Sequence, residues 1–376
     1  MDSARNREDD SQQLIDLVRL ALVPGVGPRI RQSLLERFET PARILSAAEN
    51  ELRSVPGVGP KLSAAIAAAR REIDAEAELA RCKTHGITVL TESSPPYPRL
   101  LREIPDPPGV LFCRGELLPQ DALAIAIVGT RHATQYGRKH AELLAAGLAR
   151  AGLTIVSGLA RGIDAAAHRG ALSAGGRTIA FLGSGLLNIY PPEHKQLAAE
   201  VADSGAIMSE SPAHRAPVKG AFPQRNRLIT GVSLGVIVIE AASSSGALIS
   251  ARHATEQNRE VFAVPGRIDS RMSHGCHRLI RDGAKLVESV DDVLEELGPL
   301  VEKTSDAAGR AVHHPAELVL NEQERQVLDA IGEEPKTIDD VAVDSGLPIH
   351  RVLSTLSVLE MRRLVRRLSG QLVARV

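Results

Sequence analysis

The chain has 376 residues, 43% of them hydrophobic and 24% charged, and its 45 Lys and Arg nearly balance 46 Asp and Glu. This composition excludes a disordered or fibrous chain and predicts a soluble globular protein of two or three domains. Because the net charge is only −1, a nucleic-acid surface must be a local patch. No apolar run approaches the ~18 residues of a membrane span, and the acidic start is unlike a signal peptide. We therefore expect a cytoplasmic protein that does not enter a membrane.

The cysteines are few, odd in number and far apart, at Cys82, Cys113 and Cys276, which supports neither a disulfide framework nor a zinc ribbon. Cys276 has His274 and His277 beside it, but a metal site needs more ligands at usable spacing. We expect neither a metal nor a cofactor.

Residues 1–74 predict a helical domain built on an internal repeat. The sequence PGVGP occurs at residues 24–28 and again at 56–60, about 32 residues apart. A helix is expected after each copy, at 29–38 and at 61–71. This is the pattern of tandem helix–hairpin–helix (SAM-like) motifs, in which glycines allow a tight turn and expose N–H groups. Such hairpins either hold a DNA phosphate without reading sequence or simply connect the helices of a small domain.

Residues 75–298 predict an α/β domain with a Rossmann-like parallel sheet. A proline-rich lead-in follows residue 84 and contains two strands, GITVL and VLFCRG. Apolar strands then alternate with helices, which is the pattern of a parallel sheet covered by helices. The expected strands are 125–128, 153–156, 178–182, 206–209, 236–240 and 261–264, with a helix at 136–151 and another from about residue 162.

The turns that end the first two of these strands carry the residues of an anion site. Gly129, Thr130 and Arg131 follow the first strand, and Ser157, Gly158 and Arg161 follow the second. Doubly wound sheets bind ligands at the carboxyl ends of their strands, and N–H groups beside a guanidinium hold a phosphate. The sequence therefore predicts a phosphate site at this edge of the sheet.

The third turn excludes two common nucleotide sites. Gly183 and Gly185 are followed by Asn188 where a dinucleotide fingerprint needs a third glycine. The chain also lacks the Gly-Lys-Ser/Thr of a Walker A loop, which argues against ATP hydrolysis by this domain.

The longest loop, residues 211–231, is basic and contains no acid; its cations and histidine are His214, Arg215, Lys219, Arg225 and Arg227. Loops of this length are usually functional. A helix expected from Phe222 would present Arg225, Asn226 and Arg227 in its first turn, where cations oppose the helix dipole unless an anion is bound. More arginines follow, part of them expected to form a solvated helix face: Arg252, Arg259, Arg267, Arg271, Arg278 and Arg281.

The ordered motifs IAIVGTR, SGLARGIDAAAH, LGSGL, YPPEH, FPQRNRLITG, VIVIEA, SSGALISA and REVFAVPG resemble the DNA-processing protein DprA/Smf family over residues 122–286. The resemblance implies a Rossmann-like core that binds single-stranded DNA, forms a homodimer and loads RecA on incoming strands during natural transformation. The DNA contacts that it implies are Gly129, Thr130, Arg131, Ser157, Gly158, Arg161, Arg225, Asn226 and Arg227, and less directly Lys195, Lys219, Arg252 and Arg267. Many members read Gly-x-Asn where this chain has Gly275, Cys276 and His277, so it departs from the family pattern at that turn.

Some of these residues have alternative partners within the chain. Asp164 is an alternative to phosphate as the partner of Arg131 or Arg161. Asp164 and His168, four residues apart on a helix, form either an acid–base pair or a lock for the preceding turn. Glu240 ends a strand that faces the arginine-rich loops, so we interpret it as an orienting partner for Arg225 or Arg227.

Residues 299–317 predict a polar linker, and residues 318–376 predict a winged helix-turn-helix. Helices are expected at 320–331, 338–343 and 349–364, before a hairpin through Ser369 and Gly370. The recognition helix offers His350, Arg351, Ser354 and Thr355, with Arg362, Arg363, Arg366 and Arg367 behind it. Such modules either bind the backbone of a duplex or dock proteins, and both interpretations stay open.

We expect a non-enzymatic protein that binds and protects single-stranded DNA and loads RecA. We expect contacts between arginines and DNA phosphates to contribute more affinity than base stacking, because aromatic residues make up only 2% of the chain. One alternative is a Rossmann-fold nucleotide hydrolase of the lysine-decarboxylase-like type, which carries Pro-Gly-Gly-x-Gly-Thr where this chain has ASSSG at 242–246. The other alternative is a winged-helix transcription regulator.

Overall fold

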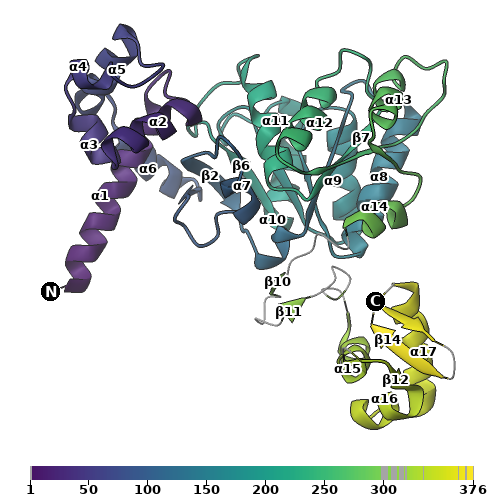
Figure 1. The fold of residues 1–376 in the computed structure, drawn as a ribbon. Helices are drawn as coiled ribbons and strands as arrows, with labels where there is room; N and C mark the ends of the chain where they lie inside the picture. The colour runs from purple at the N-terminus through teal and green to yellow at the C-terminus, as the bar shows by residue number, and fades with distance from the viewer. Residues whose placement is uncertain are drawn as a thin grey trace.

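The computed structural model describes residues 2–297, 304–305, 311–312, 317, 320–332, 334–362, 364–368 and 371–375. Within them, nine strands form one mostly parallel sheet, with a helical unit before it in the sequence and a smaller unit after it (Figure 1). This confirms the expected α/β class: a Rossmann-like core, an N-terminal helical unit and a C-terminal winged helix.

The strands of the central sheet are β1 (Thr88–Thr91), β2 (Val110–Gly115), β3 (Ala124–Gly129), β4 (Thr154–Ser157), β5 (Thr178–Phe181), β6 (Ala206–Ser209), β7 (Gly235–Ile239), β8 (Glu260–Ala263) and β9 (Lys285–Leu286). Their spatial order is β1-β2-β6-β5-β4-β3-β7-β8-β9. The strands from β6 to β9 in this order run parallel, whereas β2 pairs antiparallel with both β1 and β6. The order reverses at β3, between β4 and β7, and sheets of this kind form a crevice at the carboxyl ends of the strands that meet there.

Helices cover both faces of the sheet: α8 (Gln135–Arg150), α9 (Ile163–Ser173), α10 (Lys195–Ser204), α11 (Ala221–Gly231), α12 (Ala247–Glu256), α13 (His274–Arg281) and α14 (Val290–Leu297), with short 3-10 turns η1 (Pro119–Ala122) and η2 (Pro192–His194). The central strands are apolar throughout because a buried cluster lies on each side. Ala126 of β3 shares one cluster with Leu228 of α11, and Ile127 shares the other with Leu144 of α8. Among the described residues, no helix combines the length and apolarity that crossing a membrane requires.

The N-terminal unit contains α1 (Asp2–Leu22), α2 (Pro28–Phe38), α3 (Pro41–Ser46), α4 (Glu49–Leu52), α5 (Pro60–Glu72) and α6 (Ala75–Thr84), while α7 (Arg99–Arg102) follows β1. The two PGVGP copies adopt the same conformation. Gly25 and Gly57 have φ angles of 97° and 84°, which glycine adopts without strain. Gly27 and Gly59 cap α2 and α5 with extended backbone. The predicted repeat of two helical hairpins is therefore confirmed.

The helical unit packs on the antiparallel side of the sheet. Val18 of α1 shares a buried cluster with Phe112 of β2. Arg31 of α2 pairs with Glu92, which follows β1, and donates to the Pro107 carbonyl at 3.1 Å. The first hairpin therefore lies directly against the sheet.

The C-terminal unit has a core of its own. It consists of α15 (Glu322–Ile331), β12 (Lys336–Thr337), α16 (Ile338–Ser345), α17 (Ile349–Met361), β13 (Val365–Arg367) and β14 (Leu372–Arg375). Val327, Val341 and Leu356, one from each helix, share a buried cluster. Helix α17 ends at Met361 rather than at the expected Leu364, because Leu364 is drawn into that cluster just before β13.

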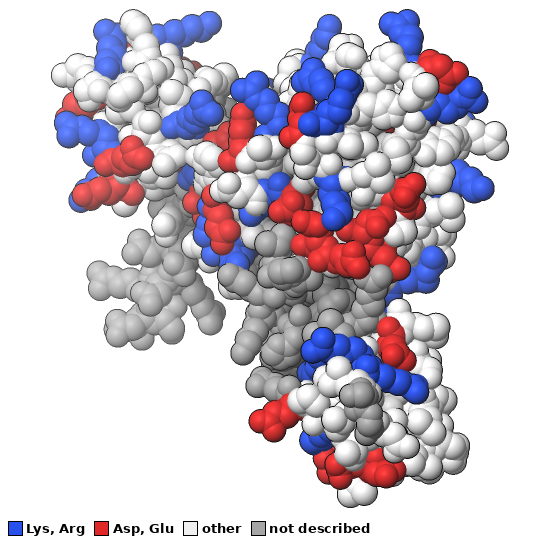
Figure 2. All heavy atoms as spheres, turned by 45° about the vertical axis from the view of Figure 1, so that its right-hand side comes forward, with Lys and Arg blue, Asp and Glu red and all other residues white. Residues whose placement is uncertain are grey.

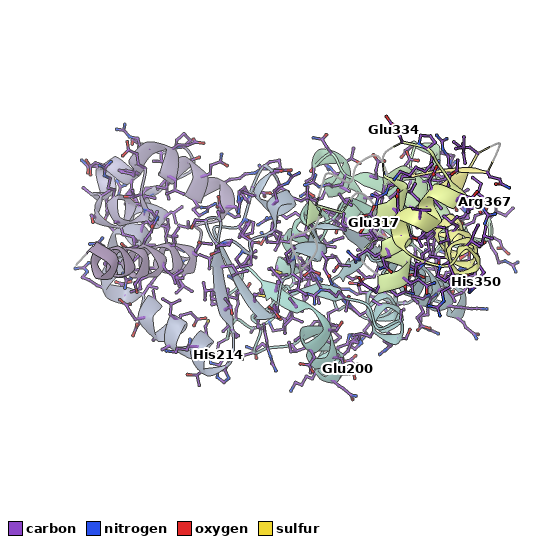
Figure 3. All side chains as sticks on the ribbon, turned by 90° about the horizontal axis from the view of Figure 1, so that it is seen from below. Glu200, His214, Glu317, Glu334, His350 and Arg367 are labelled. Atoms are coloured by element: carbon purple, nitrogen blue, oxygen red, sulfur yellow. The ribbon has the colours of Figure 1, made fainter. Side chains whose placement is uncertain are left out.

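Some of the predictions for this part of the chain lie outside the described residues. These are Arg363, Ser369 and Gly370, and most of the expected linker. Between residues 299 and 317 the structure describes β10 (Thr304–Ser305), β11 (Ala311–Val312) and Glu317. Within the C-terminal unit, His350 and Arg367 lie at its outer margin (Figure 3).

Candidate nucleic-acid interface

A cavity of about 570 Å³ opens at the carboxyl edge of the sheet, where the strand order reverses. We call it the switch-point pocket. The turn after β3 forms one wall, the first two turns of α11 form another, and the start of α12 forms a third. Gly129 brings the first wall close to β7, because a Cβ there would lie 1.9 Å from the Ile239 carbonyl oxygen. The sequence placed the ligand site at this edge, and the cavity lies there.

Arg131 lines this pocket with its guanidinium over an aromatic ring. Among the described residues no ion pair involves Arg131, although Asp164 and Arg131 line the same cavity. Its guanidinium lies 5.2 Å from the centre of the Phe222 ring, and Phe222 in turn lies 5.5 Å from the Tyr190 ring. A guanidinium resting on an aromatic face keeps its N–H groups available. The predicted alternative, an Arg131–Asp164 ion pair, is not formed.

Phe222 and Tyr190 also line the pocket, and the sequence analysis did not assign them to it. The signal was present in the composition. The chain has only 2% aromatic residues, yet Tyr190 lies just before η2 and Phe222 in the first turn of α11, both next to predicted contacts. Together they give the pocket an apolar surface beside its cation.

Arg225 and Asp164 form the buried floor of the pocket. Arg225 is 5% exposed and donates to the Phe181 carbonyl. Its guanidinium lies against Gly158, where a Cβ would lie 2.0 Å from Nη1. Burial lowers the pKa of Arg225 to about 10, which leaves it charged. Burial also raises the pKa of Asp164, and the charge of Arg225 opposes that shift.

Asp164 locks the turn after β4, as one of the two interpretations held. Its carboxylate accepts hydrogen bonds from the backbone N–H of Gly158 at 3.2 Å and of Ala160 at 3.4 Å. His168 does not pair with it: the His168 Nδ1 lies 2.7 Å from the Thr178 hydroxyl. Burial lowers the pKa of His168 to about 3, so the ring is neutral. The structure therefore contains no Asp164–His168 acid–base pair.

The interpretation of Glu240 as a partner of Arg225 or Arg227 is wrong. The Glu240 carboxylate accepts hydrogen bonds from the Thr134 hydroxyl and from the Thr134 N–H, the latter at 2.8 Å. Thr134 is the N-cap of α8. The reason is topological: β7 lies beside β3, so the residue that follows β7 faces the helix that follows β3.

Arg227 points away from the switch-point pocket. It is 6% exposed and lies between Glu210, with which it forms an ion pair, and Asp106, whose carboxylate is 3.4 Å away. Helix α11 begins at Ala221, so the arginines occupy its second turn rather than the expected first turn. Successive helical residues differ by about 100°, which turns Arg227 roughly 200° from Arg225. The two arginines therefore cannot face one pocket.

The remaining predicted contacts lie around the pocket or further away. Asn226 and Lys219 line it, and Asn226 Nδ2 lies 3.4 Å from the Gly246 carbonyl. The Ser157 hydroxyl is buried and donates to the Ile127 carbonyl at 2.6 Å. Lys195 is exposed at the start of α10, outside the pocket lining.

The other predicted arginines form exposed ion pairs. Arg161 pairs with Glu193 rather than with Asp164, so that alternative is wrong as well. Arg252 pairs with Glu256 at 2.9 Å and Arg267 with Asp269 at 2.8 Å. Exposed pairs of this kind contribute little stability and open easily, so these guanidiniums stay accessible to an anion.

The turn that departs from the family pattern is closed by the substituted residue. His277 Nε2 lies 3.0 Å from the Gly266 carbonyl, and Cys276 beside it is fully buried in the sheet cluster. His277 therefore holds the loop after β8 onto α13.

Cations gather on one edge of the molecule. Figure 2 shows most of the Lys and Arg side chains of this face along its upper part, with a few Asp and Glu among them, and a larger group of Asp and Glu side chains lower down. The nearly neutral chain thus carries a local basic surface. The fold and the site together define a Rossmann-like protein with an open, arginine-lined pocket at the carboxyl edge of its sheet, with a tandem helical hairpin before this core in the sequence and a winged helix after it.

Comparison with known proteins identifies the family. The family model of DNA recombination-mediator protein A matches residues 88–298, a DprA winged-helix model matches 311–371, and a SAM-like helix-hairpin-helix tandem matches 17–72. Protein Smf of Synechocystis is 36% identical over 93% of this chain and 95% of its own length. The DNA processing protein DprA of Bacillus subtilis is 44% identical over 58% of this chain and 74% of its own. The chain belongs to the DNA recombination-mediator protein A (DprA/Smf) family.

Solved structures agree with this assignment. The X-ray structure of DNA processing protein A from Streptococcus pneumoniae matches with a TM-score of 0.65 and 37% identity, over 74% of this chain and 95% of that one. A structure of DNA processing protein A from Helicobacter pylori, which describes its single-stranded DNA binding mode, matches with a TM-score of 0.52 and 33% identity, over 57% of this chain and 97% of that one.

Proposed function

We propose that this protein binds single-stranded DNA in the switch-point pocket, protects the strand and passes it to RecA during natural transformation. The observation that carries the proposal is Arg131, which rests on Phe222 at an open cavity and forms no ion pair within the described residues. A guanidinium held in this way presents a planar set of N–H donors that fits a phosphate. The single-stranded DNA binding described for the Helicobacter pylori relative supports the choice of ligand.

The pocket suits a flexible strand better than a duplex. Its lining combines Arg131 and Lys219 with the aromatic rings of Phe222 and Tyr190. A single strand can bend so that a phosphate meets the cations while its base meets a ring. A duplex keeps its bases stacked inside and offers phosphates at a fixed spacing. We therefore expect a preference for single strands.

We propose that the protein acts without catalysing a reaction. The acidic group in the pocket, Asp164, already accepts two backbone hydrogen bonds, and the neutral ring of His168 is bound to Thr178. Neither group is free to activate a water molecule. A nucleotide hydrolase would release free base from nucleoside monophosphates, and chromatography of the incubated mixture would detect it.

We also propose that the protein works as a homodimer through its Rossmann-like core. A dimer would present two pockets to one strand, and the linked sites would bind more tightly than either alone. Light scattering of the full chain at increasing concentration would reveal the dimer.

The direct test of the proposed ligand is a salt-titrated comparison of single-stranded DNA with a duplex of the same sequence, on the full chain. Single-stranded DNA should bind more tightly, and its affinity should fall with salt by a slope of about 0.7 for each phosphate contacted. Equal affinity for both forms at every salt concentration would contradict the proposal.

A further inference from the structure

A second, smaller cavity of about 150 Å³ lies where the first helical hairpin meets the carboxyl edge of the sheet. We call it the hairpin crevice. Gly27 and Pro28, at the start of α2, form one side, and the turns after β5 (Leu182, Gly183) and β6 (Ser211) form the other. The equivalent turn of the second hairpin is not part of it. Only the first of two hairpins with the same PGVGP turn therefore borders the crevice.

Arginines converge on this crevice from three elements. Arg31 of α2, Arg225 of α11 and Arg215 of the intervening loop all line it. Arg31 and Arg225 are 8% and 5% exposed, and within the described residues the Nε–H of each has no hydrogen-bond partner. Buried N–H groups without an acceptor are rare in folded proteins. Two arginines that each leave one donor unfilled line the same cavity, which points to an anionic ligand there.

The other charges of the crevice leave it positive. Glu210 lines it, but its carboxylate already pairs with Arg227. Arg31 is partly compensated by Glu92. Arg225 and the exposed Arg215 form no ion pair within the described residues. The crevice thus favours an anion.

Helix α2 adds the positive end of its dipole. It begins at Pro28, its N-cap is Gly27, which has no side chain to accept from the first N–H groups, and its first turn contains no acid. An uncapped helix start of this kind binds anions. Here it faces the cavity that Arg31 and Arg225 also line, so the two observations point to one ligand.

The crevice continues the switch-point pocket. Both lie at the carboxyl ends of the parallel strands, and Arg225 lines both. In Figure 1, α2, α11 and α12 follow one another along the upper side of the molecule, so a chain lying on this edge would pass from one to the next. The smaller volume fits one phosphate group rather than a whole nucleotide.

We propose that the hairpin crevice binds a backbone phosphate of the same DNA strand that occupies the switch-point pocket. This inference rests on the proposed function, because it assigns the strand a path beyond that pocket. The first hairpin then holds the strand against the sheet, and the second hairpin takes no part. A strand must be long enough to span both cavities to gain this contact.

The repeat itself supplies a matched pair of variants. Gly27 and Gly59 occupy the same position of the two hairpins, with φ, ψ of −87°, 175° and −83°, 176°. A Cβ at either would meet no atom within 4 Å. Aspartate is a favourable N-cap residue, so Gly27→Asp and Gly59→Asp should both fold. Only Gly27→Asp places a carboxylate in the crevice.

The experiment measures the affinity of the full-length variants for a dinucleotide, which is too short to occupy both cavities, and for a long strand of about 20 nucleotides. Gly27→Asp should weaken binding of the long strand about tenfold and lower its salt slope by about 0.7, while the dinucleotide binds as before. Gly59→Asp should match the wild type with both ligands. Arg215→Ala, which removes an exposed cation of the crevice, should act in the same direction as Gly27→Asp.

Several results would overturn the inference without touching the proposed function, which Arg131→Ala tests separately. Unchanged binding of the long strand by Gly27→Asp would remove the crevice from the DNA path. Equal losses in Gly27→Asp and Gly59→Asp would assign binding to both hairpins. Equal losses with the dinucleotide and the long strand would show that no distant phosphate is involved.

Inorganic phosphate alone separates the two sources of this ligand. Phosphate that raises the melting temperature of the wild type but not of Gly27→Asp, with equal binding of long strands by both proteins, would show a site for free phosphate. That result would also overturn the assignment to DNA.

Discussion

Replacing Arg131 with alanine should weaken single-stranded DNA binding at every sequence. Arg131 is exposed and forms no ion pair within the described residues, and its guanidinium lies 5.2 Å from the centre of the Phe222 ring. A hydrogen bond to a charged group contributes about 1.5–3 kcal/mol, which corresponds to a loss of affinity between about tenfold and about 150-fold. The change removes only an exposed side chain, so the free energy of unfolding should stay within about 0.5 kcal/mol of the wild type.

The salt dependence of binding is a more specific prediction than the change in affinity. Each phosphate contact with a single strand contributes about 0.7 to the slope of log affinity against log salt. When the salt concentration rises fourfold, a variant that lacks one contact should therefore lose about 2.6 times less affinity than the wild type. Fluorescence anisotropy of a labelled oligonucleotide at several salt concentrations would measure both the affinity and the slope.

Two further variants separate charge from geometry. Arg131→Lys keeps the charge but loses the planar contact with Phe222, so it should keep the slope and lose part of the affinity. Arg169→Ala, which removes an exposed cation of α9 that lines neither cavity, should change neither. A slope in Arg131→Ala that equals the wild-type slope would refute the assignment of a phosphate to this residue.

Three other perturbations test the surroundings of the pocket. Glu193→Gln removes the carboxylate that pairs with Arg161. It should tighten single-stranded DNA binding about twofold to threefold and steepen the salt slope by about 0.7. Weaker binding in the same anisotropy assay would contradict the accessibility of Arg161. Gly158→Ala would put a methyl group 2.0 Å from Arg225 Nη1, which should cost about 1–3 kcal/mol of stability in calorimetry, whereas an unchanged melting temperature would show that Arg225 can move freely. The third concerns pH: burial lowers the pKa of His168 from 6.5 to about 3, so the unfolded chain takes up the proton first. Stability should be complete above pH 6.5 and should fall by about 1.4 kcal/mol for each pH unit well below it. His168→Asn, which keeps a polar partner for Thr178, should flatten this dependence in urea unfolding, and equal pH profiles of the two proteins would refute it.

The sequence by itself determined the fold class and the place of the site. Strands such as 125–128 are apolar throughout because both of their faces are buried, and the structure shows a separate cluster on each side. The repeated PGVGP predicted two equivalent hairpins, since its glycines must take φ angles that other residues avoid. Glycine-rich turns after β3 and β4 marked the carboxyl edge of a parallel sheet, where the switch-point pocket lies. Each of these features depends on residues that are close together in the sequence, so the sequence alone predicts it.

The tertiary structure decided what each charged side chain does. Arg225 and Arg227 are two residues apart in one basic segment, and the sequence pattern does not distinguish their roles. The helical angle between them sends Arg225 to the cavities and Arg227 to Glu210 and Asp106, which lies more than 100 residues earlier in the chain. Glu240 likewise faces Thr134 because β7 lies beside β3.

The same holds for the two hairpins. They repeat one sequence, and only the packing of the first against the sheet gives it a crevice lined by arginines. A sequence pattern specifies which residues share an element, because that depends on neighbours along the chain. Which acid neutralises which base, and which base stays open to DNA, depends on distances between elements, and those are fixed only when the sheet assembles.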